Sequence, residues 1–187
     1  LLMNLKNFEL SKLINNDSII IELIKTKLLF NENISSDVSF VIKSTTKDQI
    51  FSSAMINFNI LNGSINIDQT QFVNDKIGFV EIDRSNFFFE KDQLVLNTDI
   101  KINIDNHNNF FSFLNTPKKY RKQTKNIFIN LNYNFANNSL YFNKIKIDGL
   151  EVNNEILSVF ENIDNIFDIN LNKSRRVINR LFSIYAG

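Results

Sequence analysis

The sequence predicts a mainly β protein: an antiparallel meander forming a curved, twisted sheet, with two or three amphipathic helices packed at the C-terminal end. Apolar and polar residues alternate along 94–105 and again along 127–135, which is the pattern of strands with one buried and one solvated face. The composition agrees, because nineteen Phe among 187 residues, together with many Ile, favour pleated surfaces.

The first third of the chain contains shorter patterns. Residues 1–16 fit either a helical stripe or a strand, whereas the Ile- and Leu-rich run from Ser18 to Phe30 indicates a strand. Alternation marks further strands at 38–42 and 56–60. The dipeptide Asn62-Gly63 then predicts a hairpin turn, because both residue types accept a positive φ.

The second half contains the clearest strands. Segment 94–105 places its apolar residues at even positions and its Asn, Asp and Lys at most odd ones. Segment 127–135, the turn at 136–139 and the returning segment 140–148 predict a hairpin. The apolar phase of the returning segment slips near Asn143, where we expect a β-bulge.

Helical periodicity appears in three places. Phe110, Phe113, Leu114 and Pro117 have helical spacing, and either Asn106 or Asn108 can cap the start. Two further helices are predicted around 156–167 and 177–185. We therefore expect one β-rich domain over 1–187, with a helical tail at 150–187, as the C-terminal part of a longer protein.

Composition and charge exclude several classes of function. The net charge is +1, from 21 basic and 20 acidic residues, which argues against a nucleic-acid binder with a dominant positive field. The absence of Cys excludes a disulfide framework, a thiolate nucleophile and Cys-ligated zinc. The longest apolar runs are too short to span a bilayer.

No catalytic motif is visible, so we expect neither enzymatic activity nor a cofactor or metal. His107 is the only histidine and is more typical of a helix cap or exposed loop than of a catalytic base. A polysaccharide hydrolase would require two carboxylates to meet in a cleft. The carboxylates of this chain fall on polar strand faces or in turns, where solvation is the ordinary explanation; they include Asp83, Glu90, Asp92, Asp99 and Asp105.

The strongest local charge feature is a basic cluster made by Lys118, Lys119, Arg121 and Lys122. Such a cluster fits either contact with anionic lipid headgroups or nucleic acid, or a solvated loop between a helix and a strand. We favour the loop, because a run of charges between two elements is usually a solvated segment.

The apolar face of the predicted sheet has the greatest functional potential. If helices cover it, it is core; if it is open, it exceeds the apolar patch that a soluble monomer tolerates and needs a ligand. An acyl chain suits such a face, since each buried CH₂ contributes about 0.8 kcal/mol. The residues expected to face a lipid groove are Ile100, Ile102, Ile104, Ile129, Leu131 and Tyr133.

From about Lys47 to Gly187 the order of features resembles the C-terminal region of bacterial AsmA-like proteins. The resemblance is carried by a strand, an Asn/Gly turn and a strand at 56–67, and by the long strand 94–105 before the Phe-rich helix 110–114. The hairpin 127–148, closing on Ile145-Lys146-Ile147-Asp148-Gly149, and the Asn-rich helical tail ending at 180–187 fit the same order.

This resemblance implies a periplasmic module, anchored to the inner membrane by a segment missing from this chain, that supports outer-membrane biogenesis and lipid homeostasis. It also implies a non-enzymatic role, in which an apolar groove holds or passes phospholipid acyl chains. The alternative is a structural or assembly domain that uses the same face as core and binds a protein partner through an exposed strand edge.

Overall fold

A computed structural model describes residues 2–6, 18–43, 50–153 and 171–186. The helices are α2 (Ile19–Lys25), α3 (His107–Phe113) and α5 (Leu171–Ala186), with 3₁₀ turns η1 (Leu28–Phe30) and η2 (Lys118–Tyr120). The strands are β1 (Leu2–Lys6), β2 (Ser35–Lys43), β3 (Ser53–Leu61), β4 (Ser64–Asn66), β5 (Thr70–Asn74), β6 (Gly78–Glu90), β7 (Gln93–Ile104), β8 (Asn126–Asn134), β9 (Ser139–Ile147) and β10 (Leu150–Glu151).

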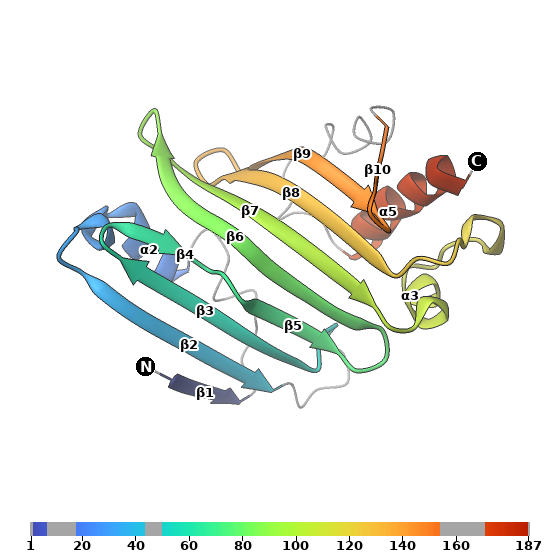
Figure 1. Cartoon of the computed structure of the whole chain (residues 1–187), viewed down its shortest axis with the longest axis horizontal. Coiled ribbons are helices and arrows are strands. Elements are labelled where there is room, and N and C mark those ends of the chain that lie inside the picture. Colours follow the sequence, from blue (N-terminus) through green and yellow to red (C-terminus); the bar gives the residue numbers. More distant parts are fainter. Residues whose placement is uncertain (1, 7–17, 44–49, 154–170, 187) are drawn as a thin grey trace.

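The strands form a 10-stranded twisted sheet (Figure 1) in the order β1-β2-β3-β4-β6-β7-β8-β9-β10, with β5 pairing both β3 and β6. Neighbouring strands pair antiparallel, except that β1 runs parallel to β2. The predicted mainly β, antiparallel fold class is therefore confirmed. The two-residue strand β10 opens the segment that was expected to be a helical tail.

Several local predictions are confirmed. Each of them depends on the local chemistry of a turn, a helix cap or a bulge. Asn62 and Gly63 have φ values of 48° and 77° in the turn between β3 and β4. The Asn106 side chain accepts a hydrogen bond of 3.0 Å from the Asn109 N–H and caps α3. The register of β8 and β9 shifts between Asn130 and Leu131, so Asn143 is the bulged residue.

The strand predicted from Ser18 to Phe30 is wrong: this segment forms α2 and η1. The Ser18 hydroxyl accepts a hydrogen bond of 3.2 Å from the Ile21 N–H, which caps the helix. Ile21 and Ile24, one helical turn apart, are both buried against the sheet. Burial at this spacing outweighs the strand preference of consecutive β-branched residues. The helix expected around 156–167 lies outside the described residues.

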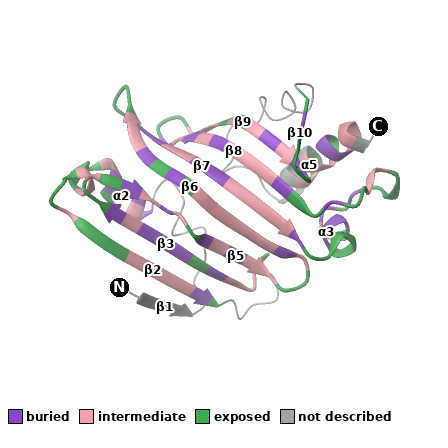
Figure 2. Ribbon diagram, in the orientation of Figure 1, coloured by how far each residue is buried: buried purple, intermediate pink, exposed green. Residues whose placement is uncertain are grey.

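One face of the sheet is apolar from β2 to β9, because the alternating apolar residues of neighbouring strands are in register. Figure 2 shows buried and intermediate residues interspersed along these strands. Strand β6 keeps to this rule only through a bulge at Arg84 and Ser85. Before the bulge Val80 and Ile82 point to the apolar face, and after it Phe87 is paired with Leu96 on the same face. The positions of the apolar residues shift by one along β6, and the extra residue of the bulge keeps these side chains on one face of the sheet.

The helices lie at opposite ends of the sheet (Figure 1) and cover the same apolar face there. At one end, Ile24 of α2 is fully buried against β2, β3 and β4. At the other end, Phe111 of α3 and Phe182 of α5 are fully buried, with ring centroids 5.0 Å apart. The Thr116 hydroxyl donates to Asn179 Oδ1 at 2.6 Å and fixes α5 beside the segment after α3.

Gly78 begins β6 at a position where no other residue fits. A Cβ on Gly78 would lie 2.0 Å from the carbonyl oxygen of Asn103, and its φ is 143°. Gly149 provides the matched comparison, because its φ is 84° but no atom lies near its missing Cβ.

We predict that Gly149→Ala lowers the free energy of unfolding by about 1 kcal/mol, from left-handed backbone strain alone. Gly78→Ala should lower it by clearly more than about 2 kcal/mol, because β6 and β7 must also separate. Urea unfolding followed by circular dichroism measures both. Equal losses in the two variants would contradict the close approach of β6 to Asn103.

Candidate functional site

The middle of the apolar face is only half-buried. A mid-sheet strip of aliphatic side chains crosses three neighbouring strands: Val80, Ile82, Leu96, Ile100, Ile102 and Ile129. Ile82 is paired with Ile100, which is paired with Ile129 on the next strand, so these side chains stand in one row. The strip lies between the core cluster under α2 and the core cluster under α3 and α5.

The structure brings the six predicted groove residues onto one face of two adjacent strands. Ile100, Ile102 and Ile129 belong to the mid-sheet strip and are half-buried. Ile104, Leu131 and Tyr133 are instead buried in the two core clusters, each about 6% exposed. The half-buried residues therefore mark the accessible part of the face, and the other three support it from the flanks.

An apolar crevice lies under α2. It has a volume of about 130 Å³, and its lining residues are all apolar, including Leu23, Phe40 and Phe58. Its lining residue Ile65 is paired with Phe87, which is paired with Leu96 of the strip. Leu23 remains 43% exposed at the edge of the crevice. Buried Ile65 and Phe87 therefore separate the crevice from the strip within one apolar face.

Tyr133 is the one polar group among the predicted groove residues. Its ring packs edge-on against Phe135 with centroids 4.6 Å apart, and its hydroxyl donates to Asn138 Oδ1 at 3.0 Å. Burial of the phenol raises the pKa of Tyr133 to about 12. Between pH 10 and 12 the unfolded chain therefore loses a proton that the folded chain keeps, and stability falls as the pH rises.

We predict that this alkaline loss of stability amounts to at most about 3 kcal/mol and is absent in Tyr133→Phe. The difference in absorbance near 295 nm between the native chain and the variant should titrate close to pH 12. A difference spectrum that titrates near pH 10 would show that Tyr133 is solvated.

The opposite face of the sheet is polar and holds a charge network that the sequence analysis missed. Asp83 and Asp99 are directly opposed on β6 and β7, and each has its own cation. Lys101 donates to Asp83 Oδ2 at 2.8 Å. This hydrogen bond lowers the pKa of Asp83, and the same bond raises the pKa of Lys101.

The stabilisation from the Asp83–Lys101 pair is lost as the pH falls through the lowered pKa of Asp83 or rises through the raised pKa of Lys101. Both side chains are more than one third exposed, so the pair contributes less than about 1 kcal/mol.

Asp99 is the buried member of this network, with only 3% of its side chain exposed. Asn130 donates to its Oδ1 at 2.7 Å, and the Arg84 guanidinium forms an ion pair with its Oδ2. The same guanidinium lies 5.9 Å from the centre of the Phe128 ring. The bulge that sets the phase of β6 thus also places Arg84 over Asp99. A sequence signal was available, because the apolar phase of β6 changes at this residue.

Arg84→Met removes the positive charge but keeps most of the side chain that covers Asp99. We predict that it lowers the free energy of unfolding by about 1–3 kcal/mol. Adding Asp99→Asn should restore most of this loss, because no buried charge then lacks a cation. Chemical denaturation of the two single variants and the double variant measures the coupling. Purely additive losses would mean that Arg84 acts through packing alone. The exposed pair provides the control, since Lys101→Met should cost less than about 1 kcal/mol.

The predicted basic cluster lies between α3 and β8 and contacts the helical end of the molecule. Arg121 Nε donates to the Thr116 carbonyl at 2.8 Å. Lys122 Nζ donates to the Tyr185 carbonyl of α5 at 2.8 Å and lies 5.0 Å from the centre of its ring. Lys119 lies 4.7 Å from the centre of the Tyr120 ring, and Lys118 is exposed. Arg121 and Lys122 therefore hold the loop in place.

His107 is exposed as the first residue of α3. Within the described ranges, no three His, Asp or Glu side chains gather as metal ligands would. No helix of the described chain has both the length and the hydropathy needed to cross a bilayer.

Comparisons with protein-family models, with curated proteins and with solved structures found no match to this chain.

Proposed function

We propose that this chain is a non-enzymatic module whose apolar sheet face holds or passes phospholipid acyl chains. The observation that carries the proposal is the mid-sheet strip, a row of half-buried aliphatic side chains between two helix-covered ends. A methylene chain gains from such a surface without any specific polar contact, at about 0.8 kcal/mol for each CH₂ it buries.

The apolar crevice under α2 supports the same occupant. Its lining is entirely apolar, and it lies on the same apolar face as the strip, beyond Ile65 and Phe87. A cavity that has no polar group to orient a ligand suits a flexible hydrocarbon better than a shaped, hydrogen-bonding molecule.

The opposed carboxylates on the other face favour a non-enzymatic role. An acid/base pair needs one carboxylate whose pKa is raised, so that it holds a proton near neutral pH. Asp83 is instead paired with Lys101, and its pKa is lowered. Asp99 is paired with Arg84. Both carboxylates are used to stabilise the sheet.

Membership of the AsmA-like family belongs to the same proposal. The elements that carry the resemblance to this family are β3, β4, β7, α3, β8 and β9, and β5 and β6 lie between β4 and β7. In this proposal the module works in the periplasm, is anchored to the inner membrane in the full-length protein, and supports outer-membrane biogenesis and lipid homeostasis. The mid-sheet strip would be its segment of a longer lipid path.

We predict that the chain, incubated with vesicles of phosphatidylethanolamine and phosphatidylglycerol and then separated from them, retains phospholipid in native mass spectra. Ile100→Gln/Ile129→Gln should reduce this retention at least about tenfold, because two paired apolar residues within the strip become polar. Lys101→Gln/Phe128→Gln is the matched control, since these residues form the adjacent opposed pair on the other face.

Circular dichroism establishes that each variant is folded, and Ile100→Ala/Ile129→Ala replaces the glutamine pair if that variant does not fold. Retention of phospholipid that is equal in the strip variant and the control would contradict the proposal. So would a native chain that retains none.

A protein-binding module is the second candidate, favoured by the edge of the sheet at β9. Strand β10 pairs only with Lys146 and Ile147, so within the described chain the preceding part of β9 has no strand on its outer side. Tyr141 on this edge is 56% exposed. Partner strands add to such edges through main-chain hydrogen bonds. A photo-reactive residue at position 141 that captures one defined protein, while one at position 100 captures no lipid, would favour this candidate.

A further inference from the structure

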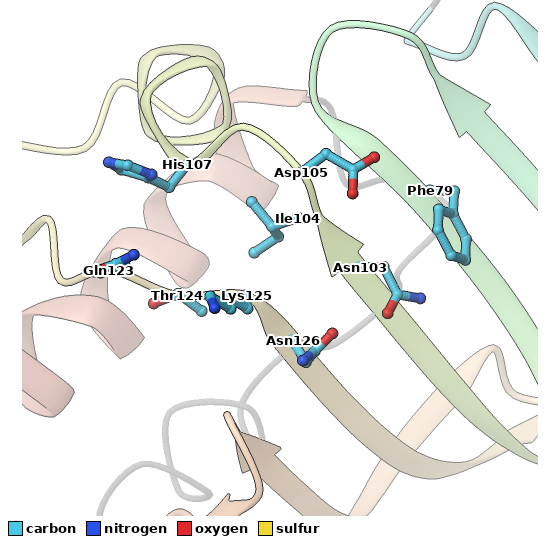
Figure 3. A pocket seen from close by; sticks show the side chains of 9 residues that line it. All are labelled: Phe79, Asn103, Ile104, Asp105, His107, Gln123, Thr124, Lys125 and Asn126. Atoms are coloured by element: carbon cyan, nitrogen blue, oxygen red, sulfur yellow. The ribbon is translucent and has the colours of Figure 1, made fainter.

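The polar face of the sheet ends in a hollow, and we propose that this hollow binds a neutral saccharide. The hollow has a volume of about 410 Å³ and lies where β7 ends and β8 begins. Figure 3 shows the side chains around it: Phe79 from β6, Asn103 from β7, Asp105 from the residue after β7, His107 from α3, and Gln123 to Asn126 from the segment entering β8.

The backbone around the hollow is fixed by short hydrogen bonds. The Ile104 N–H donates to the Lys125 carbonyl at 2.7 Å. Asp148 Oδ1 accepts from the N–H groups of Lys125 and Asn126, each at 2.8 Å. Gly78 allows β6 to approach Asn103 more closely than any side chain would permit. The hollow is therefore pre-formed, which lowers the entropic cost of binding a ligand.

One polar side chain of the hollow is already bonded, because the Thr124 hydroxyl donates to the Lys122 carbonyl at 3.1 Å. The amides of Asn103, Gln123 and Asn126 do not bond to one another or to other described residues. Asn103 and Asn126 are directly opposed on β7 and β8, yet no hydrogen bond joins them within the described chain. Asn97 and Asn132 are opposed in the same way farther along these strands, and Asn97 Nδ2 donates to Asn132 Oδ1 at 2.6 Å. The sheet thus pairs its asparagines with each other away from the hollow and leaves their amides available inside it.

The chemistry of the lining matches a sugar better than other ligand classes. Asn103, Gln123 and Asn126 carry amides that both donate and accept hydrogen bonds, as the hydroxyls of a sugar do. Asp105 and Lys125 supply one charge of each sign, which gives no net attraction for an anion or a cation. The Phe79 ring adds a flat apolar surface for the C–H face of a pyranose.

This site is independent of the proposed lipid path. Phe79, Asn103 and Asn126 belong to the polar face, whereas the mid-sheet strip occupies the apolar face of the same strands. The chain would therefore contact an apolar and a carbohydrate ligand on opposite sides of one sheet, and either site can fail without the other.

The test is NMR titration of the 187-residue chain with glucose, galactose, N-acetylglucosamine and their β-linked disaccharides. We expect at least one of these sugars to bind with a Kd of about 10 mM or tighter. The side-chain amide signals of Asn103, Gln123 and Asn126 should shift most. Asn103→Ala/Asn126→Ala should weaken binding at least about tenfold, because two hydrogen-bonding amides are lost.

Asn97→Ala/Asn132→Ala is the matched control, an opposed asparagine pair on the same strands outside the hollow, and should leave the sugar affinity unchanged. Phe79→Leu provides a second variant that keeps the apolar volume and removes the ring. The proposal is overturned if none of the sugars binds, if binding survives Asn103→Ala/Asn126→Ala, or if only inorganic phosphate or glucuronate shifts these amides.

Discussion

The structure depends on the bulge at Arg84 and Ser85 in β6. Val80 and Ile82 face the apolar side from even positions before the bulge, and Phe87 and Phe89 face it from odd positions after the bulge, so a regular strand would turn one of these two sets toward water. A shift of one residue moves every later side chain to the other face. The bulge absorbs this shift, and the apolar face stays continuous from the crevice under α2 to the cluster under α5. Arg84 then shields Asp99 on the polar face, so one local irregularity organises both sides of the sheet.

Both proposed sites follow from this separation of faces. Helices cover the apolar face at its two ends, where fully buried residues such as Ile24 and Phe182 are found. Between them the side chains of the mid-sheet strip pack against the two core clusters and stay half-buried. The polar face satisfies its amides and charges internally along most of its length. At the end that forms the hollow, the opposed amides of Asn103 and Asn126 are not joined to each other.

The sequence predicts the long strands well, because 94–105 and 127–135 alternate along most of their length and each buries one face; Val95 and Phe128 are the apolar residues that fall out of phase. It also predicts the turn at Asn62-Gly63, the Asn106 cap and the Asn143 bulge, which depend on local chemistry. It fails at 18–30, where the burial of Ile21 and Ile24 against distant strands decides in favour of a helix. Which groove residues are core cannot be read from alternation, since Ile102 and Ile104 look alike until α3 and α5 cover one of them.

The order of the strands has a consequence for how the chain folds. Strands β6 and β7 form one hairpin and β8 and β9 form another, and each is closed by a short turn, whereas α3 and η2 lie in the connection between β7 and β8. Strand β1 instead joins β2 in parallel, with α2 and η1 lying between them along the chain. Because loop closure over a longer separation costs more entropy before any contact forms, the meander can assemble first and present a finished edge, onto which the amino-terminal strand docks last.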